Sequence, residues 1–351
     1  MTAAGVLSTI GGTPLVELAK LLPGFPGRVF AKLERFNPGG SIKDRSALSL
    51  LLGGLRSGEL VPGRSVVVES SSGNLAIGIA QICRYLGLRF ICVVDAKTTE
   101  QNLAILRAYQ AEVEVVTEPD PESGEYLPVR LARVREIVEG TPHAFWPDQY
   151  SNPLNPRAHE RTMGEIADAL DGGVDYLFCA TSTFGTLRGC AAYIRAHGMD
   201  TTVVGVDAVG SVLFGGAPAP RLIPGHGASI RPALAAPELA DRVVHVADLE
   251  CVAGCRRLIG REAILAGGSS GATVAALARL APELEPGATC VLIFPDGGDR
   301  YLGTVYSDDW VRARFGEVFH LWKDDPVDGA AAPADRHRPR QTATNDWSSR
   351  G

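Results

Sequence analysis

The feature that most constrains the fold is the alternation of short, wholly apolar runs with amphipathic stretches. "SVVVES" (65–70) and "RFICVVD" (89–95) have the length and composition of buried strands, and the segment between them, 73–87, has helical periodicity and ends at Gly87. Strands that lack a polar face are typical of parallel sheets covered by helices on both sides. We therefore predict an α/β protein.

The same alternation continues through most of the chain. It forms two blocks, roughly 45–148 and 150–322, which predict two α/β domains with a cleft between them. The last segment, 324–351, is rich in Ala, Pro, Asp and Arg, and we expect it to be a disordered tail. Further strands are predicted at 112–116, 174–181, 201–208, 243–248 and 289–298, and further helices at 99–110, 126–139 and 187–198.

Composition excludes several classes of partner. The chain of 351 residues has a formal net charge of −6, whereas nucleic acid and anionic membrane surfaces are bound by concentrated basic patches. No apolar run reaches the roughly 18–20 residues of a membrane span. The N-terminus lacks the basic start and long apolar block of a signal peptide. We expect a cytoplasmic protein.

The seven cysteines predict free thiols rather than disulfides or a metal site. Their number is odd and most lie in apolar runs, which is typical of buried thiols. Cys251 and Cys255 are four residues apart on a predicted helix, but no His or Cys cluster completes a ligand set around them. We expect no bound metal.

Two glycine-rich turns after predicted strands are candidate anion sites. In "ATSTFGTLRG" (180–189), backbone N–H groups at a helix N-terminus, with Thr183, Gly185 and Thr186, would suit a phosphate. In "ESSSGNLA" (69–76), serines, a glycine and an asparagine would offer donors to a carboxylate. Each turn taken alone is equally consistent with an ordinary helix start that is rich in capping residues.

A third junction, "AGGSSGA" (266–272), places the hydroxyl of Ser269 where it could face a ring nitrogen. Ligands of α/β sheets bind beyond the carboxyl ends of the strands, so the three loops are expected on one side. Lys43, in "NPGGSIKDRSA" (37–47), is one of only five lysines and follows a glycine turn. Alone it could be a solvated helix-start residue. Together with the loops it suggests a Schiff base with a phosphorylated aldehyde, which fits pyridoxal 5'-phosphate (PLP).

On these motifs the chain resembles the fold-type II PLP enzymes of the cysteine synthase / cystathionine β-synthase family. The resemblance runs from "GGTPLVEL" (11–18) to "PDGGDRYLGTVYSDDWV" (295–311). It implies two doubly wound three-layer α/β domains, as in the tryptophan synthase β subunit, and a homodimer. The implied boundaries are 1–12 and 35–148 for a smaller domain, and 13–34 and 149–322 for a larger, PLP-binding domain.

The resemblance also implies roles for individual residues. Lys43 matches the family's Schiff-base lysine, and Ser269 matches the serine that faces the pyridine nitrogen. Asn74 would reach the cofactor's ring hydroxyl and the substrate carboxylate. The phosphate loop is matched by Ser182, Thr183, Phe184, Gly185 and Thr186, and the carboxylate-binding residues by Ser71, Ser72, Gly73, Asn74 and Gln149. A neutral serine at the ring nitrogen favours β-elimination and β-replacement over transamination.

Several segments depart from an ordinary cysteine synthase. Ser182 and Phe184 replace glycines of the phosphate loop, and the substrate loop reads "SSSGNLA". The chain is most similar to the branch that makes N-(2-amino-2-carboxyethyl)-L-glutamate from O-phospho-L-serine and L-glutamate, for 2,3-diaminopropionate in siderophores or peptide antibiotics. Such anionic substrates require donors near the cleft. Arg130, Tyr150 and Ser182 are the candidates, although Arg130 could be a surface arginine.

Three further points stay open from the sequence. His226, in "PGHGAS", could line the entrance or face solvent on a loop. A cysteine synthase that uses O-acetylserine or O-phosphoserine with sulfide is the alternative reaction. A catalytically silent, regulatory relative is a third possibility, which the intact lysine and phosphate loop disfavour.

Overall fold

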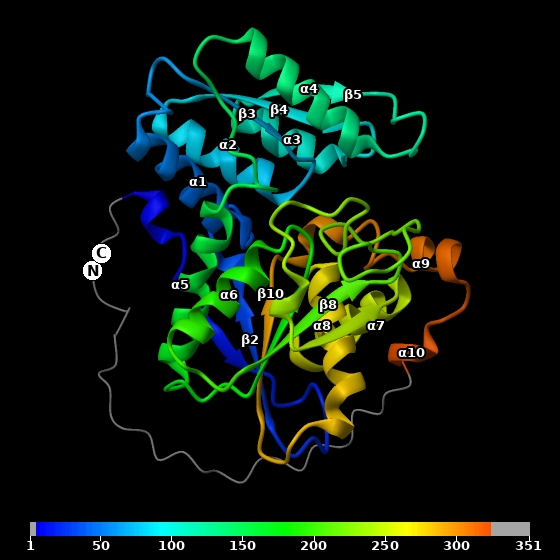
Figure 1. The fold of residues 1–351 in the computed structure, drawn as a ribbon. Helices are drawn as coiled ribbons and strands as arrows, with labels where there is room; N and C mark the ends of the chain where they lie inside the picture. Colours follow the sequence, from blue (N-terminus) through cyan, green and yellow to red (C-terminus); the bar gives the residue numbers. More distant parts are fainter. Residues whose placement is uncertain (1–4, 324–351) are drawn as a thin grey trace, which may run out of the picture.

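The computed structural model describes residues 5–323, which form two sheets (Figure 1). The four-stranded sheet has the order β5-β4-β3-β6, and all its strands are parallel. The six-stranded sheet has the order β1-β2-β10-β7-β8-β9, in which only β1 is antiparallel to its neighbour. The strands are β1 (Leu15–Glu17), β2 (Arg28–Leu33), β3 (Val66–Ser70), β4 (Arg89–Asp95), β5 (Glu112–Val116), β6 (Ala144–Phe145), β7 (Tyr176–Ala180), β8 (Thr202–Ala208), β9 (Arg242–Val246) and β10 (Thr289–Phe294).

Helices cover both faces of each sheet. On the four-stranded sheet, α4 (Tyr126–Gly140) packs on one face, and α2 (Asn74–Leu86) and α3 (Glu100–Ala108) lie on the other (Figure 1). The six-stranded sheet lies between two helix pairs. These pairs are α5 (Leu154–Ala169) with α6 (Gly185–Ala196), and α7 (Asp248–Glu262) with α8 (Gly268–Leu280).

The remaining elements join the two sheets or complete the chain. Helix α1 (Lys43–Ser57) packs against both α2 and α5, so it contacts both parts of the molecule. The other elements are α9 (Asp308–Phe315), α10 (His320–Lys323) and the short 3₁₀ helices η1 (Val6–Thr9), η2 (Glu34–Phe36), η3 (Pro237–Leu239), η4 (Ala281–Glu283) and η5 (Gly298–Tyr301).

The predicted α/β class is confirmed, and each strand and helix predicted by residue range is present with small shifts at its ends. Gly87 ends α2 in the left-handed conformation, with φ of 68°. The junction at 266–272 differs from the other two, because it does not follow a strand. That segment follows α7, and Ala266 forms only an isolated bridge with Gly297. The predicted tail at 324–351 lies outside the described residues, and the domain boundaries stay a prediction.

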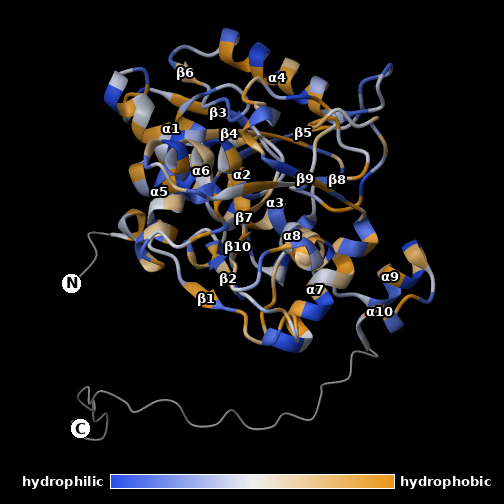
Figure 2. Cartoon of the chain, turned by 60° about the horizontal axis from the view of Figure 1, so that its bottom comes forward, coloured by the Kyte–Doolittle hydropathy of each residue, from blue (hydrophilic) through white to orange (hydrophobic). Residues whose placement is uncertain are grey.

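Hydrophobic residues gather on the strands and on the helix faces that cover them (Figure 2). All seven cysteines are buried and free, as the sequence predicts. Within residues 5–323, no helix is long and apolar enough to cross a membrane.

Candidate active site

Lys43 lies at the junction of the two sheets, as the first residue of α1. The turn before it contains Gly40 at φ of 85°, a left-handed conformation that favours glycine. The Ile42 N–H donates to the carbonyl of Pro295 at 2.7 Å, which fixes the turn against the end of β10. Burial of the amine lowers the pKa of Lys43 from 10.5 to about 8. The amine is therefore far more often neutral, and so nucleophilic, than that of a surface lysine.

The predicted phosphate loop connects β7 to α6 and faces the lysine. Lys43 Nζ donates to Thr183 Oγ1 at 3.4 Å, and the same oxygen accepts from Asn155 Nδ2 at 3.3 Å. Gly185 is required here, because a Cβ at this position would lie 2.5 Å from Asn155 Oδ1. That Oδ1 atom is buried and has no hydrogen-bond partner among the described residues.

Phe184 adopts a conformation that normally favours glycine. Its φ is 66°, in the left-handed region. Its side chain is 1% exposed and packs against Phe214, with ring centroids 5.3 Å apart. Burial of the ring offsets the backbone strain, which explains how a phenylalanine can replace a glycine of the family's loop. Ser182 and Thr186 are half-buried on either side of this turn.

The predicted substrate loop ends where α2 begins, at Asn74. Ser71 Oγ accepts from the N–H groups of Gly73 and Ala76, at 3.4 and 3.3 Å. Ser71 therefore acts partly as a cap of α2, which was the alternative function of this loop. Ser72 keeps its hydroxyl on the side of α4, where it accepts a hydrogen bond from Arg130.

Asn74 is held by residues from the far end of the chain. Its Nδ2 atom donates to Asp296 Oδ2 at 2.8 Å, and its Oδ1 atom accepts from Arg300 Nη1. Arg300 Nη2 also donates to the Gly39 carbonyl at 2.7 Å, in the turn before Lys43. One guanidinium thus contacts both the lysine turn and the substrate loop.

Arg130 lies inside the molecule, so the alternative of a surface arginine is wrong. It is 8% exposed, and its Nη1 atom donates to Ser72 Oγ at 3.3 Å. Its Nε atom lies 3.3 Å from Asp95 Oδ2, at the end of β4. Burial raises the pKa of the nearby Tyr150 to about 12, with the Arg130 charge acting in the opposite direction. Tyr150 therefore stays a neutral hydroxyl donor at physiological pH.

Gln149 links the substrate loop to the phosphate loop. Its Nε2 atom lies 3.5 Å from the Ser70 carbonyl, and its own carbonyl accepts from Asn155 Nδ2 at 2.8 Å. Since Asn155 also contacts Thr183, a chain of contacts runs from Lys43 to the substrate loop. The structure therefore brings these predicted residues together.

Two predicted residues lie at the edge of this contact chain. Ser269 is 5% exposed in the first turn of α8, two residues after Gly267, whose N–H donates to the Asp296 carbonyl at 3.2 Å. His226 is 1% exposed, so the alternative of a solvent-facing histidine is wrong. Burial lowers the pKa of His226 to about 4. The N–H of Gly227 donates to the Thr181 carbonyl at 2.8 Å, which places this loop beside the phosphate loop.

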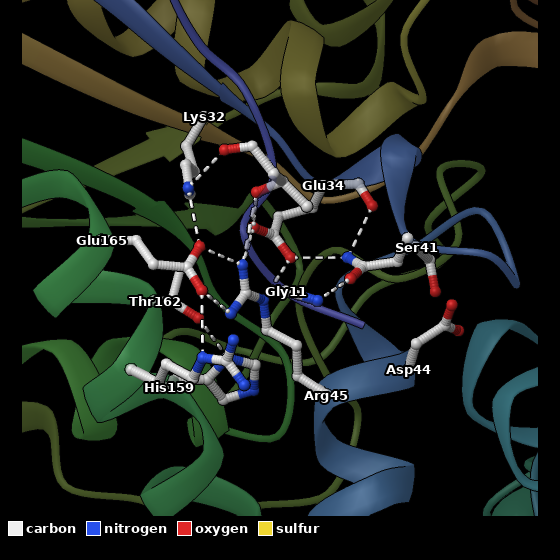
Figure 3. A network of polar contacts seen from close by, with 12 residues as sticks. Gly11, Lys32, Glu34, Ser41, Asp44, Arg45, His159, Thr162 and Glu165 are labelled. Atoms are coloured by element: carbon white, nitrogen blue, oxygen red, sulfur yellow. Dashed lines mark hydrogen bonds and ion pairs between the residues drawn. The ribbon is translucent and has the colours of Figure 1, made fainter. Parts of the chain in front are cut away.

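A buried charge cluster, which sequence reasoning missed, holds α1 in place (Figure 3). Arg45 lies between two carboxylates: its Nε atom is 2.7 Å from Glu34 Oε2, and its Nη2 atom is 2.6 Å from Glu165 Oε2. Lys32 Nζ lies 2.8 Å from Glu165 Oε2. Burial alone would raise the pKa of Glu165, but the hydrogen bonds from Arg45, Gly12 and Lys32 hold it at about 2. The cluster joins α1, η2, β2 and α5, and its arginine lies two residues after Lys43.

The site's chemistry fits PLP. A buried amine of lowered pKa suits an aldehyde, and the N-terminus of α6 with the Thr183 hydroxyl suits a phosphate. Lys43 would hold the aldehyde carbon, residues 182–186 the phosphate, and Asn74 and Ser269 the ring.

Comparisons with known proteins agree with this chemistry. A family model described as "Pyridoxal-phosphate dependent enzyme" matches residues 6–296. N-(2-amino-2-carboxyethyl)-L-glutamate synthase of Ralstonia nicotianae is 49% identical over 312 residues, which cover 89% of this chain and 92% of that protein.

Solved structures of the same fold are similar over nearly the whole chain. Cysteine synthase from Entamoeba histolytica has a TM-score of 0.81 at 31% identity and covers 87% of this chain and 91% of its own. O-ureido-L-serine synthase has a TM-score of 0.80 at 31% identity. The match covers 89% of this chain and 100% of the synthase. The chain therefore belongs to the pyridoxal-phosphate dependent enzymes, with the fold-type II architecture of cysteine synthases.

Proposed function

We propose that this protein joins O-phospho-L-serine and L-glutamate to give N-(2-amino-2-carboxyethyl)-L-glutamate and phosphate. The product would supply 2,3-diaminopropionate for a siderophore or a peptide antibiotic. The observation that carries the proposal is Arg130, a buried guanidinium that donates to Ser72 in the predicted substrate loop. The relative from Ralstonia nicotianae, named for this product, supports it.

The proposed reaction is a β-replacement. Bound PLP supplies an electron sink that stabilises negative charge at Cα of the amino acid. The Cβ–O bond breaks with its electron pair leaving on phosphate, and the glutamate amine forms the Cβ–N bond and loses a proton. Lys43 would take the α-proton and return it at the end.

The lowered pKa of Lys43 supports this role. With a pKa of about 8, about a quarter of the amines would be neutral at a pH of about 7.5, against about one in a thousand at the ordinary pKa of 10.5. Thr183 Oγ1, at 3.4 Å, would orient the amine when it is free. A neutral amine is the form that can accept a proton.

The surroundings of Ser72 support anionic substrates. A phosphate leaving group and a second dicarboxylate both gain from a guanidinium in a site of low solvent exposure. Asp95 balances the charge of Arg130 in the absence of substrate, at 3.3 Å from its Nε atom. Tyr150 and Ser182 would add hydroxyl donors. Sulfide, the nucleophile of the alternative cysteine synthase reaction, has no carboxylates and needs no such set of donors.

Release of inorganic phosphate tests the proposal. The holoenzyme is mixed with O-phospho-L-serine, and phosphate release is followed with L-glutamate, with sulfide and with neither. We expect glutamate to accelerate release at least about tenfold more than sulfide, a difference of about 1.4 kcal/mol in activation free energy. Faster release with sulfide, or turnover of O-acetylserine but not O-phosphoserine, would favour the cysteine synthase reaction.

The active unit is proposed to be a homodimer, as in the family. Light scattering of the holoenzyme after gel filtration tests this part, with a mass of about twice 37.1 kDa expected. A mass near 37.1 kDa would contradict it.

A further inference from the structure

We propose that Arg300 is a positioning residue, which with Asp296 fixes the carboxamide of Asn74 so that one amide hydrogen is directed at an acceptor oxygen of the bound ligand. The inference rests on the proposed assignment of Lys43 and Asn74 to the cofactor site. It concerns two charged residues to which the sequence assigned no role.

The contacts of Asn74 determine which way its amide points. Oδ1 accepts from Arg300 Nη1, and Nδ2 donates to Asp296 Oδ2 at 2.8 Å. A guanidinium has only donors and an ionised carboxylate has only acceptors. A flipped amide would therefore place NH₂ against the guanidinium and oxygen against the carboxylate, so the observed orientation is strongly preferred.

One donor of Asn74 remains. An amide NH₂ group has two hydrogens, and in the described part of the chain Nδ2 donates only to Asp296. The second hydrogen is available to a ligand that offers an oxygen acceptor. The ring hydroxyl of the cofactor, once ionised, is such an acceptor. An unfixed asparagine could offer either its oxygen or its nitrogen, and would stabilise the ionised form less.

Asp296 is itself held rigidly. Tyr301 Oη donates to Asp296 Oδ2 at 2.6 Å, and Ser41 forms an isolated backbone bridge with Asp296. Its other oxygen is closely packed on Gly267, where a Cβ would lie only 1.9 Å away. Asp296 is 4% exposed, so its carboxylate cannot move away from Asn74 without disturbing these neighbours.

The second arm of Arg300 fixes the lysine turn. Nη2 donates to the Gly39 carbonyl at 2.7 Å, and the Gly39 N–H donates to Asp44 Oδ2 at 2.5 Å, beside Lys43. The planar fork of arginine allows one side chain to contact Asn74 and Gly39 together, which lysine cannot do with the same geometry. Arg300 thereby sets the distance between the lysine and the ring donor.

Arg35 provides a matched control. Arg35 and Arg300 line the same cavity of about 230 Å³, together with Gly40 and Asp299. Arg35 donates to the Leu265 carbonyl at 2.8 Å and to Asp299 at 3.1 Å, and neither contact involves Asn74 or Gly39. Arg35→Met therefore removes a nearby guanidinium but keeps the contacts of Arg300 with Asn74 and Gly39.

The test compares Arg300→Met, Arg300→Lys and Arg35→Met as PLP-loaded proteins. The readouts are the ratio of the absorption bands of the ionised and neutral ring hydroxyl, and the Kd for PLP. We expect both Arg300 variants to lower the band ratio severalfold and to weaken PLP binding about tenfold, as for a lost charged hydrogen bond. Arg35→Met should match the wild type. Unchanged Arg300 spectra, or equal effects at Arg35, would overturn the inference.

A double-mutant cycle separates positioning from general damage. In an Asn74→Ala background, Arg300→Lys should change the band ratio much less than in the wild type, because the oriented amide is already absent and only the contact with the Gly39 carbonyl is lost. Independent, additive effects would contradict the inference. These readouts need no amino acid substrate, so failure to make the glutamate adduct would refute the proposed function alone. A wild-type protein without a covalent PLP band would refute the Lys43 assignment and this inference with it.

Discussion

Lys43 Nζ and Thr183 Oγ1 lie 3.4 Å apart, although 140 residues separate them in sequence. The contact joins the first residue of α1 to the loop that begins α6. Asn155, from α5, donates to the same hydroxyl at 3.3 Å. The amine is thus positioned beside the N-terminus of α6.

The rate of covalent PLP binding should depend on pH through Lys43. The neutral amine is the reactive form, and its pKa is lowered to about 8 by burial. We expect the rate for the apoprotein to rise about tenfold per pH unit below about 8 and to level off above it. Stopped-flow absorbance checks this. A rise that continues to about pH 10 would show an ordinary lysine.

Lys43→Ala should abolish the borohydride-trapped PLP adduct, whereas Lys20→Ala, at an exposed position, should retain it. Peptide mass spectrometry locates the adduct. An adduct that persists in Lys43→Ala at another lysine would remove Lys43 from its proposed role.

Arg130→Gln should weaken O-phospho-L-serine binding far more than PLP binding. The variant removes the charge that contacts Ser72 but keeps a polar side chain. We expect KM for O-phospho-L-serine to rise about 10- to 100-fold, the effect of losing a charged hydrogen bond, while the Kd for PLP changes less than about twofold.

Arg133→Gln, on the same helix, is the control for Arg130. Arg133 is 42% exposed as a side chain and pairs with Glu114 and Glu136. Loss of the Arg133 guanidinium should leave the KM for O-phospho-L-serine unchanged. If Arg130→Gln weakened PLP and substrate binding equally, Arg130 would be a structural residue.

Arg45→Met should destabilise the protein strongly. It leaves Glu34 and Glu165 without their main partner, and the contact with Glu34 is fully buried while that with Glu165 is partly buried. Breaking such a pair costs about 3–5 kcal/mol in the free energy of unfolding. Arg242→Met, which breaks an exposed pair with Glu283, should cost no more than about 1 kcal/mol. Urea unfolding measures both, and equal losses would contradict the role of the cluster.

The stabilisation from Glu165 should disappear in acid. Its pKa is about 2 in the folded protein, below the ordinary 4.5, so the folded state favours the ionised form. The contribution is therefore fully present above pH 4.5 and is lost as the pH falls towards about 2. The stability difference between wild type and Glu165→Gln should shrink over this range. A constant difference would show that ionisation of Glu165 is not involved.

The sequence predicts most strands because they are largely apolar, but it does not predict the short strands β1 and β6, nor the longer β2. It contains Lys32, and a charged residue argues against a buried strand. The structure buries that lysine at 1% exposure because Glu165 lies 2.8 Å away, on a helix that periodicity alone cannot place beside it. The pairing is visible only after folding.

In the active site, too, the sequence does not predict contacts between residues that are far apart in the chain. Motifs at 43, 71–74 and 182–186 identified local loops, because each combines glycine with hydroxyl residues at a helix start. The partners of Asn74 lie 222 and 226 residues away, at Asp296 and Arg300, and no local pattern marks them. The segment "PDGGDRYL" marks the end of the family resemblance, but the roles of its charged residues required the structure.

The origin of the nitrogen in the product distinguishes glutamate from sulfide as the nucleophile. The holoenzyme is given O-phospho-L-serine with equal concentrations of ¹⁵N-labelled L-glutamate and sulfide, and the products are identified by mass spectrometry. We expect N-(2-amino-2-carboxyethyl)-L-glutamate that carries the label, with phosphate released in equal amount. Cysteine as the product, without a labelled glutamate adduct, would contradict it.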